Sequence, residues 1–381
     1  METKIICRRC IYNNSIPKIV FDKEGICNYC RLIENLEKEY GTGTEDGEKK
    51  FLEIVDKIKK DGKGKKYDCI VGVSGGTDSS YMLYNAVELG LRPLAAHYDN
   101  TWNTAIATEN IRKVTSKLKV DLFTIVVNNK EIDDIFKSFF KASVSELDAS
   151  TDIGLAETLY RAASKYKVKY ILEGHSFRAE GVAPLGWAYI DGKYIDDVHK
   201  KYGEMKSSTF PNMKLLTFLK WITIKRIKKI RPLWYLKYSK EEAKEFLKNK
   251  FGWEYYGGHH LENRMTAFHH SYYTPRKFGI DQRCNSISAS VRSGKISRDE
   301  GLKLYEQPPY LEPELLEYFK KRMGFSDDTF ERIMNLPPKT FRDFRTYKKT
   351  FERMRPFFWI MYKLNLVPKS FYIKFTSSKE I

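Results

Sequence analysis

The fold is predicted from one run of residues, Val71-Gly72-Val73-Ser74-Gly75-Gly76-Thr77-Asp78-Ser79-Ser80. It stands between an apolar stretch typical of a buried strand and a segment typical of a helix. Glycines let the backbone turn tightly and aim successive N–H groups at an anion, while a helix N-terminus adds partial positive charge. Serine and threonine hydroxyls donate further hydrogen bonds, so the run predicts a phosphate cradle. Its spacing, and its lack of a lysine, distinguish it from the loop of ordinary P-loop NTPases.

Short apolar runs alternate with helical stretches on both sides of this loop. Strands are expected at 69–73, 94–98, 122–127 and 170–173. Helices are expected at 48–60, 79–90, 104–118, 131–142 and 154–167. This alternation predicts an α/β fold with a doubly wound parallel sheet that is covered by helices on both faces.

Three regions follow from the same pattern. Residues 1–40 hold few long apolar runs and need metal to supplement a small core. The alternating α/β domain is expected at 48–204, after a glycine-rich linker. From 205 to 381, basic and aromatic helical segments punctuated by prolines predict a helical C-terminal region that binds substrate and partners.

Composition and charge narrow the class of protein. The chain has 381 residues, of which 42% are hydrophobic and 30% charged, which excludes a disordered or peptide-sized protein. Lys and Arg number 67 against 49 Asp and Glu, and the net charge of +18 favours polyanionic partners or an anionic membrane surface. We see neither a signal peptide nor a segment long enough to span a membrane, and therefore expect a cytoplasmic protein, with peripheral membrane contact left open.

Four of the six cysteines form two pairs near the N-terminus, Cys7-x2-Cys10 and Cys27-x2-Cys30. Two such knuckles match tetrahedral Zn²⁺, which would stabilise a small module without taking part in catalysis. An iron–sulfur cluster held by the same four thiolates is the main alternative. Cys69 and Cys284 stand alone.

Polar side chains gather after the predicted strands, where doubly wound sheets bind ligands. Asp78 is the one carboxylate inside the cradle, so we assign it to Mg²⁺, with helix N-capping as the alternative. Asp99 and Asn103 follow the second strand, near where an adenosine would lie. Asp152 precedes the fourth strand, and Gly174-His175-Ser176-Phe177-Arg178-Ala179-Glu180-Gly181 follows it.

The Ser-Gly-Gly-x-Asp-Ser core of the cradle resembles the signature of the PP-loop ATP pyrophosphatases, which include asparagine, GMP and NAD synthetases and tRNA lysidine and thiolation enzymes. The resemblance implies that ATP is cleaved between its α and β phosphates. ATP is expected to contact Ser74, Gly75, Gly76, Thr77, Asp78, Ser79, Ser80, Asp99, Asn103 and Gly174.

A second, more specific resemblance runs nearly end to end. It rests on the loop and on the segments 99–103, 174–181, Tyr256-Gly257-Gly258-His259-His260-Leu261-Glu262-Asn263-Arg264 and Lys277-Phe278-Gly279-Ile280-Asp281. Together these are similar to the N-acetyl sugar amidotransferase family, including the WbpG-like and PseA-like enzymes of surface-polysaccharide and flagellin-glycan biosynthesis. The resemblance implies conversion of a sugar acetamido group to an acetamidino group, using ATP and ammonia.

This resemblance implies an acidic nucleotide sugar as substrate. Its candidate contacts are Asp152, Arg178, Glu180, His259, Glu262, Asn263, Arg264, Lys277, Arg283 and Arg292. A solvated basic face explains any one of the Arg and Lys residues equally well. The candidate catalytic residues are Asp78, His175 and His260, the histidines for proton transfer or ammonia delivery.

No glutaminase motif is visible, so the resemblance implies a partner glutaminase with a cyclase-like subunit. The amphipathic stretch 215–231 is a candidate docking helix, and a core-facing helix or an interfacial membrane helix are the alternatives. A PP-loop tRNA-modifying enzyme is the rival function, although a thiolase normally needs reactive cysteines near ATP, and a non-enzymatic ATP-binding scaffold is a third. We do not expect a nucleic-acid partner.

Overall fold

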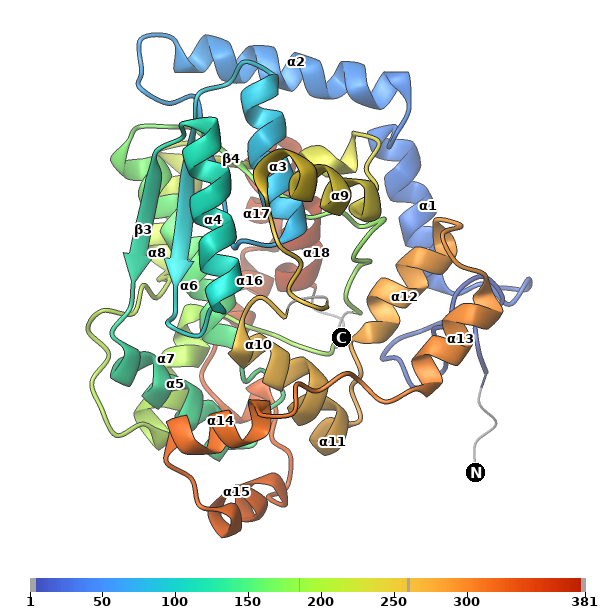
Figure 1. The fold of residues 1–381 in the computed structure, drawn as a ribbon, viewed down its shortest axis with the longest axis vertical. Helices are drawn as coiled ribbons and strands as arrows, with labels where there is room; N and C mark the ends of the chain where they lie inside the picture. Colours follow the sequence, from blue (N-terminus) through green and yellow to red (C-terminus); the bar gives the residue numbers. More distant parts are fainter. Residues whose placement is uncertain (1–4, 185, 259–260, 378–381) are drawn as a thin grey trace.

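The computed structural model describes residues 5–184, 186–258 and 261–377. Within these residues the centre is a sheet of five parallel strands in the order β3-β2-β1-β4-β5 (Figure 1). The strands are β1 (Cys69–Gly72), β2 (Pro93–Asp99), β3 (Leu122–Val126), β4 (Tyr170–Leu172) and β5 (Lys228–Ile230). The chain builds outward from β1 to β3 and then returns to the other side of β1, so the switch point of the sheet lies between β1 and β4.

Helices pack on both faces of this sheet (Figure 1). One face is covered by α2 (Glu45–Gly62), α3 (Thr77–Glu88), α4 (Ala105–Leu118) and α9 (Lys240–Phe251). The opposite face is covered by α6 (Ala149–Lys165), α8 (Leu215–Thr223), α16 (Lys348–Arg353) and α17 (Arg355–Lys363). Val71 belongs to the first core and Ile70 to the second, because successive strand residues point to opposite faces. The predicted doubly wound α/β class is confirmed.

The predicted strands and helices around the loop lie close to the observed ones. The helix expected at 79–90 begins two residues earlier, at Thr77, and the helix expected at 154–167 begins at Ala149. Cys69 lies in a buried strand, as predicted.

The predicted end of the strand pattern at residue 205 is wrong. The stretch 215–231 is not one helix: it forms α8, turns at Arg226 with φ +50°, and then pairs with β4 as β5. Lys229 can occupy a strand position because its ammonium group binds the carboxylate of Glu173 at 2.5 Å, and Arg231, which follows the strand, binds the same carboxylate at 3.3 Å. Phe218, Trp221, Ile222 and Ile227 are buried in the protein's own core, which agrees with the core-facing alternative.

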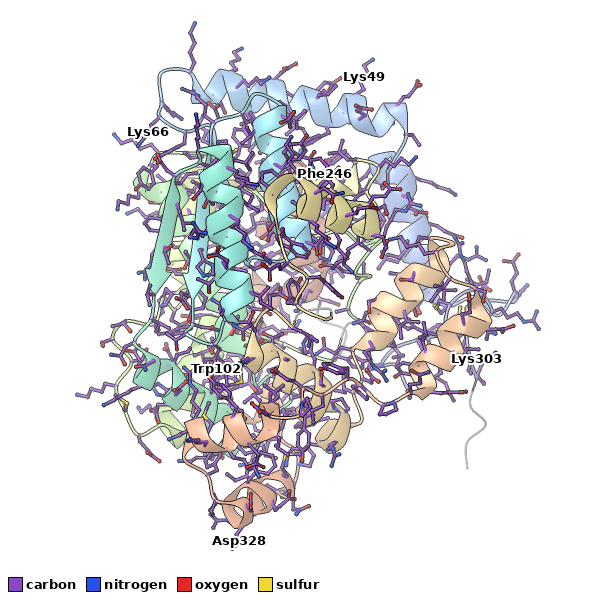
Figure 2. All side chains as sticks on the ribbon, in the orientation of Figure 1. Lys49, Lys66, Trp102, Phe246, Lys303 and Asp328 are labelled. Carbon is purple, nitrogen blue, oxygen red and sulfur yellow. The ribbon has the colours of Figure 1, made fainter. Side chains whose placement is uncertain are left out.

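The remaining helices extend the molecule beyond the carboxyl end of the sheet. They are α5 (Asn129–Ala142), α7 (Gly192–Tyr202), α10 (Arg264–Phe268), a π-helical turn (His269–Tyr273), α11 (Thr274–Phe278), α14 (Leu315–Met323) and α15 (Asp327–Met334), with α18 (Lys369–Thr376) beside α16 and short 3-10 turns at Pro232–Trp234 and Phe341–Asp343. Trp102 is buried among them, whereas Lys49 and Lys66 project from the opposite end of the molecule (Figure 2). Among the described helices, none combines the length and apolar character that crossing a bilayer requires.

The N-terminal cysteines lie beside elements from the far end of the chain. Helix α1 (Asn28–Tyr40) is capped by Cys27 and contains Cys30, and α12 (Arg283–Arg292) and α13 (Arg298–Glu306) cover the cysteines (Figure 1). Cys284 and Ile287 pack into the same core as the four paired cysteines. The cysteine module therefore shares its core with the C-terminal region.

Candidate active site

The glycine loop joins β1 to α3 at the switch point. Gly75 has φ +81°, and a Cβ there would lie 2.2 Å from the carbonyl oxygen of Ala107, so the close approach to α4 requires glycine. Gly76 is the N-cap of α3 and provides no side-chain cap. The N-cap position therefore leaves the first turn of α3 without a side-chain cap, as suits a phosphate cradle, and the hydroxyl group of Tyr256 borders the loop, 3.2 Å from where a Cβ on Gly76 would lie.

The hydroxyl groups of the loop divide into two sets. Ser74 and Ser79 lie within the loop: Ser79 Oγ accepts from the backbone N of Ser74 at 3.2 Å, and Ser74 Oγ accepts from the backbone N of Gly76 at 3.3 Å. Thr77 and Ser80 are buried in the first turn of α3. Ser74 and Ser79 are thus the half-exposed hydroxyls available to a phosphate.

Asp78 is held by two residues that sequence analysis missed. Lys240 Nζ donates to Asp78 Oδ2 at 2.8 Å, and Tyr238 Oη donates to Oδ1. Burial alone would raise the pKa of Asp78, but Lys240 and these hydrogen bonds hold it below its ordinary value. Lys240 also lies 3.8 Å from Glu180. The N-cap alternative for Asp78 is wrong, because Gly76 caps the helix; the cation beside Asp78 in the structure is Lys240, and Mg²⁺ stays a prediction.

The segment after β2 is bonded directly to the segment that begins α10. Asn263 Nδ2 donates to Asn103 Oδ1 at 3.0 Å, and the backbone N of Thr104 donates to the carbonyl oxygen of Glu262 at 2.9 Å. Asn103 in turn donates to Asp99 Oδ1 at 3.4 Å. A Cβ on Gly76 would lie 3.2 Å from Glu262 Oε1, so the carboxylate of Glu262 borders the cradle. These predicted residues therefore meet at one edge of the sheet.

The segment after β4 packs on the start of α3. A Cβ on Gly174 would lie 2.7 Å from the carbonyl oxygen of Asp78. Next to it, the indole N–H of Trp234 donates to His175 Nδ1 at 3.1 Å. Because an indole N–H can only donate, Nδ1 accepts, and a neutral His175 carries its proton on Nε2. Nε2 lies 3.6 Å from Glu180 Oε2. In this tautomer His175 offers a donor to a carbonyl or phosphate oxygen.

The other predicted substrate contacts are divided between this site and more distant structure. Asp152 and His175 line a neighbouring cavity of about 1380 Å³. Arg264 stacks on Tyr318 with its guanidinium carbon 4.6 Å from the ring centre. His259 and His260 lie outside the described residues.

The structure does not bring four of the predicted basic residues to the loop. Arg178 pairs with Glu37 of α1 at 3.2 Å. Lys277 donates to the carbonyl oxygens of residues 333, 334 and 336, where it caps the end of α15. Arg283 binds Asp281 at 2.6 Å, and Arg292 lies over the ring of Tyr12 beside the cysteines. Basic side chains bind backbone carbonyls and carboxylates as readily as ligands, so their sequence context did not separate these roles.

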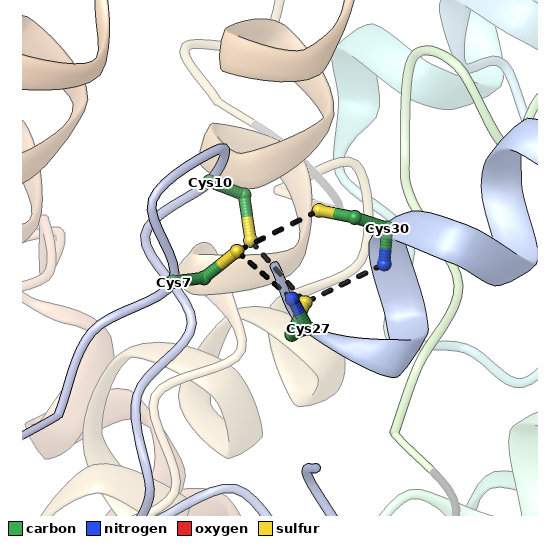
Figure 3. Close-up of side chains that lie close together, drawn as sticks. All are labelled: Cys7, Cys10, Cys27 and Cys30. Atoms are coloured by element: carbon green, nitrogen blue, oxygen red, sulfur yellow. Dashed lines mark hydrogen bonds between the residues drawn. The ribbon is translucent and has the colours of Figure 1, made fainter. Parts of the chain in front are cut away.

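The four N-terminal cysteines form a buried tetrad that could hold a metal ion (Figure 3). Their sulfur atoms all lie within 4.8 Å of one another, with Cys7–Cys30 at 3.9 Å and Cys10–Cys27 at 3.8 Å. Tetrahedral Zn²⁺ with bonds of about 2.3 Å separates its sulfurs by about 3.8 Å. In a four-iron cluster each thiolate binds a different iron, which requires wider spacing, so the tetrad fits zinc better. Hydrogen bonds from Cys27 and Cys30 lower the pKa of Cys10 to about 7, and the charge of Arg292 acts in the same direction.

Lys240, Tyr238 and Trp234 carry no motif that marks them in the sequence. The sequence pattern indicates only the start of a helix at Ser239-Lys240-Glu241-Glu242. The structure has that helix start, because Ser239 caps α9 by accepting a hydrogen bond from the backbone N of Glu242. The contact of Lys240 with Asp78 joins positions 162 residues apart. Only the folded sheet brings them together.

The fold and the loop define an α/β protein with a doubly wound parallel sheet and a glycine-rich anion loop at its switch point. Residues 262–356 match the family model described as the C-terminal domain of LPS biosynthesis protein WbpG-like. The chain therefore carries a WbpG-like C-terminal domain, as the resemblance predicted, and this domain begins at Glu262 beside the loop.

The chain is also similar to the uncharacterized protein MJ1599 of Methanocaldococcus jannaschii, with 26% identity over 318 residues that cover 83% of this chain and 98% of that protein. Among solved structures, an NMN synthetase from Francisella tularensis matches at a TM-score of 0.32 and 12% identity, covering 76% of this chain and 97% of that one. The U34-tRNA thiolase NcsA from Methanococcus maripaludis, solved with its 4Fe-4S cluster, matches at 0.33 and 15%, covering 89% and 91%.

Proposed function

We propose that this protein is an ATP-dependent, sugar-modifying enzyme of the C–N ligase type. The observation that carries the proposal is the junction of the two parts: the first residues of the WbpG-like domain, Glu262 and Asn263, are bonded to the loop after β2 and border the phosphate cradle. A domain related to lipopolysaccharide biosynthesis thus contributes directly to an anion site suited to ATP.

In its finer form, the proposal is an amidotransferase that converts the acetamido group of an acidic nucleotide sugar to an acetamidino group. The amide oxygen attacks the α-phosphorus of ATP, the bond between the α-phosphorus and the bridging oxygen breaks, and pyrophosphate leaves. Ammonia then adds to the imidate carbon of the O-adenylyl imidate and AMP departs with the former amide oxygen. Ammonia comes from a partner glutaminase with a cyclase-like subunit, in surface-polysaccharide or flagellin-glycan biosynthesis.

The residues at the loop suit these two displacements. Such steps depend on positioning and charge neutralisation, which the first-turn amides of α3, Lys240 and the hydroxyls of Ser74 and Ser79 supply. The Nε2–H of His175 suits a hydrogen bond to the amide oxygen or to the α-phosphate. If Mg²⁺ binds, Asp78 is the carboxylate that would hold it at the phosphates, and its charge would relieve the repulsion between that carboxylate and ATP.

The cysteines offer little reactive chemistry for the rival function, which is sulfur transfer to tRNA. Cys69 is buried in β1 and Cys284 in α12, and burial raises the pKa of both thiols. A buried thiol with a raised pKa is a poor nucleophile. The other four cysteines form the metal tetrad.

The test is pyrophosphate release from ATP and Mg²⁺, with ammonium chloride as nitrogen source. UDP- and CMP-linked N-acetyl sugar acids are compared with bulk tRNA. We expect release that depends on the sugar, and a product lighter by the difference between O and NH. Asp78→Ala should abolish the release, whereas Asp56→Ala, an exposed aspartate of α2, should leave it unchanged. Release with tRNA alone would overturn the proposal in favour of tRNA modification.

A further inference from the structure

A large cavity lies beside the loop rather than in it. It has a volume of about 1380 Å³, more than enough for a ligand of nucleotide size. It is bordered by α6, β5, residues 182–184 and 186–190, and the C-terminal helices α16 and α18. None of its described lining residues belongs to the loop or to α3. ATP held on the cradle would leave this cavity available.

The cavity is strongly cationic. Ten lysine and arginine residues are among its described lining residues, against two carboxylates, Asp152 and Glu352. Four of the cations have a carboxylate partner: Lys229 and Arg231 pair with Glu173, Lys348 with Glu352 and Lys369 with Glu39. In the part of the chain that the structure describes, no carboxylate oxygen lies within 4 Å of a side-chain nitrogen of the other six, although the backbone N of Arg345 donates to Asp197; the six are Lys193, Arg342, Arg345, Lys349, Arg353 and Lys374. This surplus of charge at a concave surface attracts an anion.

Lys374 is the clearest example of a cavity cation that has no carboxylate partner. It lies on α18, in the cavity wall, and the carboxylates whose charges reach it, Asp152 and Glu146, form no ion pair with it. Burial lowers the pKa of this ammonium group. Lys374 is only partly buried, and an entering phosphate would give its ammonium group a close counter-ion.

Aromatic rings stand among these cations. Tyr189, Trp187, Trp234 and Phe375 line the same cavity. Lys348 Nζ lies 5.7 Å from the ring centre of Tyr189, and Arg231 lies 4.9 Å from that of Trp234. Aromatic faces in a cavity with a surplus of cations suit a ligand that carries a nucleobase together with phosphate.

His175 connects the cavity to the loop. It lines the cavity, and the adjoining Gly174 packs on the backbone of Asp78. A ligand in the cavity can therefore present one end to the cradle across His175, while its phosphates stay on the basic wall formed by Lys374 and its neighbours.

We propose that this cavity is a second nucleotide site, in which a phosphate-linked nucleotide sugar binds with its phosphate on Lys374 and the basic C-terminal wall, separately from ATP. The inference rests on the proposed function, since it locates the second substrate of that reaction. It assigns the nucleotide end to the cavity and the sugar end to His175.

The test is binding to the full chain by calorimetry, without turnover. UDP and CMP are titrated separately into protein saturated with ATP and into protein without it. We expect at least one of them to bind in both cases with similar affinity. Lys374→Gln should weaken that binding about tenfold, as loss of a charge-assisted phosphate contact does. Lys303→Gln, on the exposed face of α13 and outside the cavity, is the matched control (Figure 2).

Unchanged ATP affinity in Lys374→Gln shows that the variant is folded, and Arg345→Gln, at an exposed position of the same wall, replaces it if it is not. Failure of UDP and CMP to bind, displacement of either by stoichiometric ATP, or equal affinity in wild type and the wall variant would overturn the second site. Nucleotide binding that depends on Lys374, in a protein that releases no pyrophosphate with any sugar, would retain the site and reject the proposed function.

Discussion

Gly75→Ala should destabilise the fold far more than Gly64→Ala, although both glycines have a positive φ. The angles are +81° at Gly75 and +77° at Gly64, so each variant places alanine in the left-handed region. That conformation costs about 1 kcal/mol in both. At Gly64, no described atom lies within 4 Å of the new Cβ, whereas at Gly75 the carbonyl oxygen of Ala107 would be 2.2 Å away. Gly64 is therefore a control for φ alone.

The difference in free energy of unfolding between the two variants measures how closely the loop packs against α4. To restore ordinary contact, the loop or the carbonyl of Ala107 must move by about 1 Å, and overpacking of this kind costs about 1–3 kcal/mol. The shift also disturbs the hydrogen bond that Trp253 Nε1 donates to the carbonyl oxygen of Gly75 at 3.0 Å. We expect a loss of about 3 kcal/mol for Gly75→Ala and about 1 kcal/mol for Gly64→Ala.

Urea unfolding followed by tryptophan fluorescence gives both free energies of unfolding. Calorimetry with ATP should show that Gly75→Ala also weakens nucleotide binding, because the cradle has moved, while Gly64→Ala does not. Equal destabilisation by the two variants would refute the close packing of the loop on α4. Full ATP affinity in a destabilised Gly75→Ala would refute its role in the cradle.

Three other perturbations test the charges and the metal tetrad. Because folding lowers the pKa of Asp78, this carboxylate stabilises the fold above pH 3.8, its ordinary pKa, and the stabilisation is lost as the pH falls through the lowered pKa. Lys240→Met should reduce the free energy of unfolding by about 3 kcal/mol at pH 7, measured by urea titration. The pKa of Glu173 is lowered from 4.5 to about 2 despite burial, mainly by Lys229; Glu173→Gln should lose about 3 kcal/mol at pH 7, with the difference from wild type vanishing as the pH falls from 4.5 to 2. We expect elemental analysis to find about one zinc ion per chain in wild type and in Cys69→Ser, and none in Cys27→Ser; equal zinc in all three proteins would reject the tetrad as the metal site.

Local pattern was sufficient to predict the four strands around the loop, because each is a short apolar run between helical segments; β1, β2 and β4 are buried, whereas Leu122 and Val126 of the edge strand β3 are exposed. The cysteine tetrad was also predictable, since its spacing is a property of the ligands themselves. The fifth strand was not. Lys228-Lys229-Ile230 is short and basic, and only its distant partner Glu173 makes a strand position favourable for Lys229.

The site was predicted in part for a related reason. Asn103, Gly174, Glu262 and Asn263 flank strands or belong to motif segments, and the fold brings them to one edge of the sheet. A lysine that caps a helix looks the same in sequence as one that grips a phosphate. Lys277 was therefore expected at the substrate but binds the end of α15, while Lys240 was overlooked beside Asp78.

The most direct test of the central claim follows the amide oxygen. A nucleotide-linked N-acetyl sugar acid carrying oxygen-18 in its acetamido carbonyl is incubated with the protein, ATP, Mg²⁺ and ammonium chloride, and the AMP is examined by mass spectrometry. Attack of the amide oxygen on the α-phosphorus predicts that the label appears in the phosphate of AMP, in amounts equal to the acetamidino product. Formation of that product with unlabelled AMP would contradict the O-adenylyl imidate, and label retained in the sugar with no product would contradict amidotransfer itself.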